Sequence, residues 1–145
     1  MRIPWYFAAL GAALVWGMHY PLMGYVLKKL SLVSALVLAG LPVLVVGLVG
    51  HKTLAQDMAV IKSMTWSERL PIMAIPLTSL LATVLLYHAI NSKNATLASL
   101  LEISYPVFVV FFAYLFFREW HINNSVLIGA VFIFSGVALI ITGNR

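Results

Sequence analysis

The sequence predicts an all-α membrane protein with five transmembrane helices. Hydrophobic residues make up 63% of the 145 residues, charged residues only 9%, and the mean hydropathy is +1.02. A soluble domain of this length is about half apolar and about one quarter charged. The apolar residues also form five long runs that contain almost no charge, at 5–27, 32–50, 70–90, 95–117 and 125–143. Lipid is therefore the expected solvent for most of the chain.

Each run has the length that a transmembrane helix needs. About twenty residues at a rise of roughly 1.5 Å each cover the ~30 Å hydrocarbon layer. A helix also satisfies its own backbone hydrogen bonds where water is absent. Short connections, "KKLS", "NSKN" and "REWHINN", join three of the pairs, so neighbouring helices should run antiparallel. We expect one domain over residues 1–145.

The long connection at 51–69 is the only one with room for structure of its own. We expect a helix in the headgroup layer, since Leu54 and Met58 fall on one stripe. Thr53 and Gln56 have the spacing of a capping box. A mobile polar loop is an equally good interpretation, and neither one implies chemistry.

Three side chains within the runs can titrate near neutral pH: His19, His88 and Glu102. His88 lies near a helix end, where an imidazole can reach the interface. Helices one and four run in opposite directions, which places His19 and Glu102 within about 2 Å of the same depth. An ionised carboxylate inside a bilayer costs about 3 kcal/mol or more, so it needs a partner or a wet cavity.

We therefore predict that His19 partners Glu102 and that the pair couples proton movement to solute movement. The structural alternative is a neutral Glu102 that bonds a backbone carbonyl, Ser99, Ser104 or Tyr105 and serves only helix packing.

Small residues form a stripe along the last run. Gly129, Gly136 and Gly143 repeat every seven residues, which lets another helix approach closely, as small-xxx-small faces do. We expect this stripe to pack against a second copy of the chain in a homodimer.

Basic residues are divided almost evenly between the two expected sides of the membrane. Orientation follows an excess of Lys and Arg on the cytoplasmic side, so a near tie permits insertion both ways and an antiparallel dimer. The side of the amino terminus has five such residues and the other side has four; they are Arg2, Lys52, Lys62, Arg69 and Arg118 against Lys28, Lys29, Lys93 and Arg145.

Several function classes find no support in the sequence. Cysteine is absent, which excludes a disulfide framework and a thiolate metal site. We find no metal-spaced histidines, no glycine-rich phosphate loop and no nucleophile with a base, so we expect neither a cofactor nor enzyme activity. The net charge of +5 lies in the connections, where it orients the protein and attracts lipid headgroups rather than nucleic acid.

Three segments together resemble an EamA-like domain of the drug/metabolite transporter superfamily. They are "ALVWGMHYPLMGYVLKK", "YHAINSKNATLASLLEISYPVFVVFFAYLFFRE" and "LIGAVFIFSGVALI", and they cover essentially the whole chain. Members tend to have a Trp-Gly pair in the opening helix, matched by Trp16 and Gly17. Their fourth helix has a mid-helix proline and ends on a glutamate, matched by Pro106 and Glu119.

The resemblance implies a transporter of small metabolites in a cell membrane, which we expect to be a bacterial inner membrane. Its cavity would be lined mainly by the first, third and fourth helices, with Trp16, His19, Glu102 and Tyr105 as the cavity residues. Typical members resemble two such units in tandem, the second inverted, whereas this chain has one. The chain would thus be the half-unit of an inverted-repeat transporter and would act as a dimer by alternating access.

The expected solute is a small organic molecule, neutral or zwitterionic. Two alternatives stay open. The chain could be a flippase for a lipid-linked head group, or a non-transporting membrane subunit that stabilises another protein.

Overall fold

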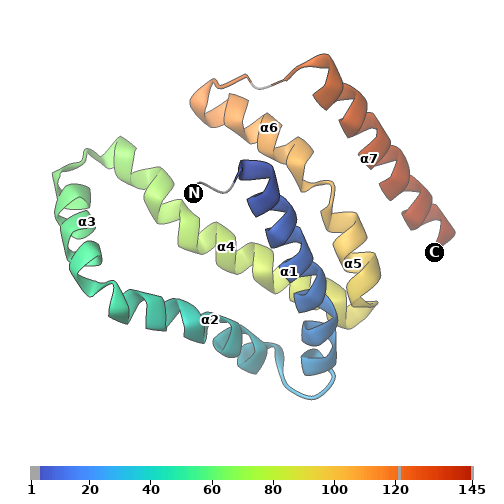
Figure 1. Ribbon diagram of the computed structural model, residues 1–145, viewed down its shortest axis with the longest axis horizontal. Coiled ribbons are helices and arrows are strands. Elements are labelled where there is room, and N and C mark those ends of the chain that lie inside the picture. The colour runs from blue at the N-terminus through green and yellow to red at the C-terminus, as the bar shows by residue number, and fades with distance from the viewer. Residues whose placement is uncertain (1–3, 121, 145) are drawn as a thin grey trace. The chain divides into compact units, whose positions relative to one another are not determined.

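The computed structural model describes residues 4–120 and 122–144, and these residues form seven helices and no strand. Arg2 and Arg145, two of the residues in the charge comparison, lie outside the described residues. The helices follow one another through short connections (Figure 1). In chain order they are α1 (Trp5–Leu27), α2 (Leu32–Val49), α3 (His51–Ser63), α4 (Trp66–Ser92), α5 (Ala95–Glu102), α6 (Tyr105–Phe117) and α7 (Asn124–Gly143).

The predicted helix at 5–27 has the predicted bounds, and those at 32–50 and 125–143 differ by one residue at one end. Side-chain caps explain two of the starts. Ser31 accepts a hydrogen bond from the Ser34 N–H at the start of α2, and Asn123 accepts one from the Val126 N–H at the start of α7.

The expected helix at 70–90 is longer than predicted, because α4 begins four residues earlier, at Trp66. The Glu68 carboxylate accepts hydrogen bonds from the Thr65 N–H (2.8 Å) and the Thr65 hydroxyl (2.7 Å). This arrangement resembles a capping box and fixes the start of the helix. Pro71 and Pro76 lie inside α4 without ending it.

The predicted span at 95–117 has the predicted bounds, but it is not one continuous helix, because the chain leaves the helix after Glu102 and re-enters it at Tyr105. Asn94 caps the start of α5 through a hydrogen bond from the Leu97 N–H to its side chain (2.8 Å). Pro106 occupies the first turn of α6, where a missing N–H is tolerated. The fourth apolar run is therefore two half-helices joined by a turn.

The connection at 51–69 contains a helix, α3, and is not a mobile loop. The predicted capping box at Thr53 and Gln56 is wrong, because α3 already begins at His51, directly after Gly50. The Leu54 N–H bonds the Gly50 carbonyl (3.0 Å), so the chain turns from one helix into the next. Leu54 and Met58 are about half exposed, and their contact with lipid headgroups stays a prediction.

Four segments of the described residues are long and apolar enough to cross a membrane: α2, α4, the combined segment Ala95–Phe117, and α7. The chain is therefore an integral multi-pass membrane protein. Four of the five predicted spans are therefore supported by their length and hydropathy. Helix α1 has 23 residues but is not one of the four, since His19, Tyr20 and Pro21 lower its hydropathy.

The helices divide into two units, Leu22–Ser92 and a unit formed by Met1–Pro21 with Lys93–Arg145. In the first, α2 packs against both α3 and α4. Its core consists of the buried side chains of Met23, Leu27, Ala35, Tyr87 and Ile90.

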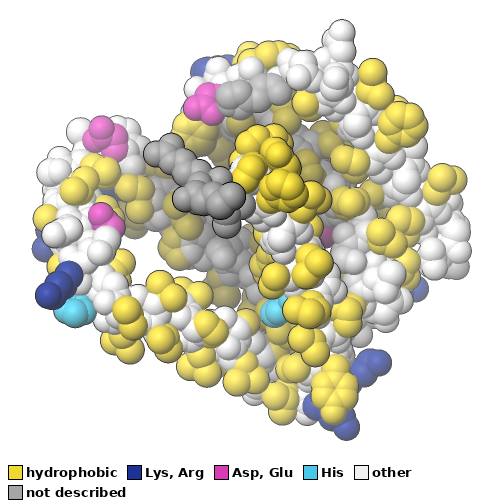
Figure 2. Space-filling model, in the orientation of Figure 1, with side chains coloured by type: hydrophobic (Ala, Val, Ile, Leu, Met, Phe, Trp, Pro, Cys, Tyr) yellow, Lys and Arg dark blue, Asp and Glu magenta, His cyan; other side chains and the backbone are white. Residues whose placement is uncertain are grey.

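In the second unit, α5 packs against α7. None of its described side chains is buried. Hydrophobic side chains are spread over the visible helices in Figure 2, between backbone and uncharged side chains, while charged ones lie mostly at helix ends and over α3. Such a surface suits a surrounding of lipid or of another protein chain.

Candidate functional site

Three aromatic side chains lie together on one face of α1. His19 and Tyr20 follow Trp16 by three and four residues, a spacing that brings side chains together on a helix. The ring centroids of Trp16 and His19 are 5.1 Å apart, and those of Trp16 and Tyr20 are 5.8 Å apart. His19 and Tyr20 are partly exposed, while the exposed fraction of Trp16 is 52%.

Glu102 joins this aromatic group through Tyr20. The Tyr20 hydroxyl donates a hydrogen bond to the Glu102 carboxylate, across 82 positions of the sequence. Both side chains are half-buried within the same unit. We call these four residues (Trp16, His19, Tyr20 and Glu102) the Glu102 cluster. An acid in an apolar span thus has a hydroxyl partner, as its burial requires.

The sequence did not identify Tyr20 as a functional residue. Its position could have indicated a role, because Tyr20 lies one helical turn after Trp16 and next to His19, two of the predicted cavity residues. The predicted partnership of His19 with Glu102 stays a prediction. The structure does place His19 beside both aromatic rings of the cluster, with its centroid 6.5 Å from that of Tyr20.

Glu102 is also the last residue of a half-helix. The Ile103 N–H bonds the Ser99 carbonyl (3.1 Å), and the Ser104 N–H bonds the Leu101 carbonyl (3.2 Å), which closes the turn after α5. Residue 106 is a proline and has no N–H, so the Glu102 carbonyl cannot receive the bond of a continuous helix. A carboxylate and a released carbonyl of the same residue thus mark the helix break.

Tyr105, the fourth predicted cavity residue, begins α6 on the other side of this break. Its side chain is 60% exposed. Tyr105 thus lies three residues after Glu102, across the helix break, whereas its role in binding stays a prediction.

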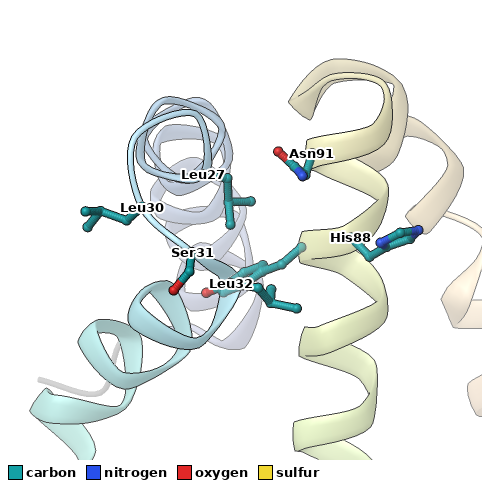
Figure 3. Close-up of a pocket in the computed structure, with 7 residues that line it drawn as sticks. Leu27, Leu30, Ser31, Leu32, His88 and Asn91 are labelled. Carbon is teal, nitrogen blue, oxygen red and sulfur yellow. The ribbon is translucent and has the colours of Figure 1, made fainter.

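A pocket of about 210 Å³ lies in the other unit, between the end of α1, the start of α2 and the end of α4. Figure 3 shows the Asn91 side chain on the side of Leu27 and the His88 ring on the opposite side of α4. The His88 Nε2 lies 3.4 Å from the Ser92 hydroxyl. His88 thus has a local partner at a helix end, as expected for an interfacial histidine.

The predicted contact stripe on α7 is open in the single chain. A Cβ atom added at Gly129, Gly136 or Gly143 would meet nothing within 4 Å. These glycines are therefore not needed for packing among the described residues.

Within residues 4–120 and 122–144, no three His, Cys, Asp or Glu side chains gather in a group that could hold a metal ion. The chemistry that the Glu102 cluster can perform is therefore that of a carboxylate, a phenol hydroxyl, an imidazole and an indole. These groups can exchange protons and bind a polar solute.

Comparison with known proteins gave one match. The model of the EamA-like transporter family matches residues 3–142, nearly the whole length of the sequence. Neither a curated protein nor a solved structure matched the chain.

Proposed function

Because the chain belongs to the EamA-like transporter family, we propose that it is a secondary transporter that moves a small organic metabolite across the bilayer. The observation that carries this proposal is the Tyr20–Glu102 hydrogen bond at the helix break. Polar groups and discontinuous helices within apolar spans are where transporters bind their substrates.

The proposal includes α1 as a fifth span. Its 23 residues reach about 35 Å as a helix, enough to cross the hydrocarbon layer. Two of the residues that lower its hydropathy, His19 and Tyr20, belong to the Glu102 cluster. A helix that lines a polar cavity tolerates such residues, because they face water or solute rather than lipid.

We further propose that two copies complete the pathway by alternating access. Five spans give one inverted-repeat half, and a second copy supplies the other half. The open stripe of Gly129, Gly136 and Gly143 supports a contact in which two backbones approach closely. An antiparallel dimer is favoured by the near tie of basic residues on the two sides.

Proton coupling is the part of the proposal that rests on Glu102. A carboxylate that binds either a proton or a solute must release one before it takes the other, which links the two movements. His19, beside Tyr20, is the second group that can exchange protons there.

The test uses purified protein in liposomes. A screen for solutes that raise the thermal stability of the protein identifies ligands, since a ligand of the folded form raises its apparent stability. Uptake of such a ligand should occur with the protein and not in empty liposomes. Glu102→Gln should abolish uptake driven by a proton gradient, and His19→Ala should impair it, while both variants still assemble.

Normal uptake by both variants would show that the pair has no coupling role. Loss of folding in Glu102→Gln would make Glu102 structural. Movement of a labelled lipid head group instead of a soluble solute would favour the flippase. Failure to move any solute, together with capture of a second membrane protein, would favour an assembly subunit.

A further inference from the structure

We infer that the pocket between the end of α1, the start of α2 and the end of α4 holds the phosphate group of an anionic membrane phospholipid. The pocket lies in the unit Leu22–Ser92 and shares no residue with the Glu102 cluster, so this binding is independent of the proposed transport. The place and size of the pocket, the polar groups in its wall and the charges beside it support this assignment.

The pocket lies at the border of the membrane and is small. One span begins beside it, at Leu32, and another ends beside it, at Ser92, and the ends of spans reach the headgroup layer. Its volume of about 210 Å³ is below the roughly 300 to 1,000 Å³ of pockets that enclose a whole small ligand. The pocket therefore suits one part of a larger molecule, such as a head group whose acyl chains stay in the bilayer.

The wall of the pocket combines apolar and polar side chains. Leu27, Leu30 and Leu32 suit the glycerol and the first methylene groups of a lipid. Ser31 and Asn91 add a hydroxyl and an amide, which supply hydrogen-bond donors. Figure 3 shows the Asn91 side chain on the side of Leu27. Because the oxygens of an ionised phosphate ester accept hydrogen bonds, a phospholipid matches both parts of the wall.

Two lysines adjoin the pocket in the chain. Lys28 and Lys29 lie between two leucines of the wall, and both are exposed. The N–H groups of Lys29 and Leu30 bond the Val26 carbonyl (2.9 and 2.8 Å), which closes the turn that contains the lysines. The Lys29 ammonium lies 5.9 Å from the centre of the Tyr25 ring, a neutral partner that leaves its charge in place. Basic groups beside a pocket between membrane helices attract anionic head groups.

The acids of this unit are distant from the two lysines. Its only acidic residues are Asp57 and Glu68. Asp57 lies in α3, beyond the far end of α2, whose 18 residues span about 27 Å (Figure 1). Glu68 lies in the first turn of α4, about 35 Å along that helix from Asn91. Neither acid is thus placed to neutralise the lysines, and an anionic head group can do so.

Titration with short-chain lipids tests the site. Dioctanoyl phosphatidylglycerol has a net negative charge, and dioctanoyl phosphatidylcholine has the same chains but no net charge. Native mass spectrometry of the purified protein in a neutral detergent counts the lipids that each chain retains. The anionic lipid should bind about tenfold tighter or more, because two lysines attract its head group. Glycerol phosphate and dioctanoylglycerol, the two halves of such a ligand, should each bind more weakly than the whole lipid.

Charge variants locate the binding. The double variant Lys28→Gln, Lys29→Gln should bind the anionic lipid about 30-fold more weakly, the equivalent of about 2 kcal/mol. The matched control Lys52→Gln, Lys62→Gln loses the same charge from α3 and should keep the binding. All four lysines are exposed, so both double variants should fold and should melt at the wild-type temperature in the absence of lipid.

Variants at the end of α4 test the pocket itself. Asn91→Asp is nearly isosteric and places a negative charge in the wall, so it should also weaken the binding of the anionic lipid. Ser92→Asp adds the same charge beside His88, whose ring lies on the opposite side of α4, and it should largely keep the binding.

Equal binding of the two phospholipids would overturn the inference, as would an equal loss in the two double-lysine variants. A preference that survives both Asn91→Asp and the loss of Lys28 and Lys29 would also overturn it. Binding of glycerol phosphate as tight as that of the anionic lipid would assign the pocket to a soluble phosphate ester instead. Equally tight binding of dioctanoylglycerol would show that the pocket recognises only the apolar part.

Discussion

Replacing Gly136 with leucine should weaken dimer formation without harming the single chain. A Cβ at this position meets nothing within 4 Å, so the first atom of the new side chain has room among the described residues. Leucine is also the better helix former, by about 0.8 kcal/mol. We therefore expect a loss of association to arise from the contact between chains.

The expected size of that loss follows from packing. Added methylene groups in a close-packed contact cost about 1 to 3 kcal/mol, which corresponds to about a 5- to 150-fold weaker dimerisation constant. Energy transfer between donor- and acceptor-labelled copies, measured over a range of protein-to-lipid ratios, reports this constant. Transport should fall in parallel, since one unit alone cannot complete the pathway.

Gly40 in α2 provides the matched control. It is also a helical glycine whose added Cβ would meet nothing, yet it lies outside the α7 stripe. Gly40→Leu should dimerise like the wild type. The reasoning fails if Gly136→Leu associates normally, or if Gly40→Leu weakens association to the same degree.

Three further substitutions test the local structure. Tyr20→Phe removes the hydroxyl that bonds Glu102 and should reduce transport about tenfold or more, because hydrogen bonds to charged groups contribute about 1.5 to 3 kcal/mol; uptake that stays at the wild-type level would show that this bond is incidental. Pro106→Ala restores an N–H opposite the Glu102 carbonyl, so slower hydrogen exchange across the break and lower transport are expected; unchanged exchange would mean that proline does not maintain the break. Thr65→Ala removes the hydroxyl that donates a hydrogen bond to Glu68 and should weaken the start of α4, seen as a lower melting temperature, with transport per folded molecule unchanged.

The sequence was sufficient to predict the long helices, because length and hydrophobicity dominate in lipid. The sequence did not predict where helices α3 and α4 begin or where the fourth span breaks, because single hydrogen bonds determine these positions. The segment "TWSE" at 65–68 has the Thr-x-x-Glu spacing of a capping box, and attention to it would have given the start of α4. The sequence shows Pro106 as a mid-helix proline, but the break falls before it, after Glu102, whose carbonyl loses the N–H of residue 106 as a partner.

The sequence predicts how deep in the membrane the candidate site lies, but it does not predict which face of α1 turns toward Glu102. Matching depths placed Glu102 level with the part of α1 that contains His19. Adjacent residues on a helix point about 100° apart, so depth alone cannot distinguish His19 from Tyr20. Which of them meets the carboxylate depends on how α1 is rotated about its axis, and packing between segments 82 positions apart sets that rotation.

Proton movement driven by the solute tests the central claim most directly. Liposomes that contain the protein and a pH-sensitive dye are mixed with a ligand from the stability screen, with no imposed gradient. The wild type should change the internal pH when the solute enters, and the exposed-acid control Glu68→Gln should do the same. Glu102→Gln, folded and dimeric, should give no change. A pH change in Glu102→Gln equal to that of the wild type would contradict the role proposed for Glu102.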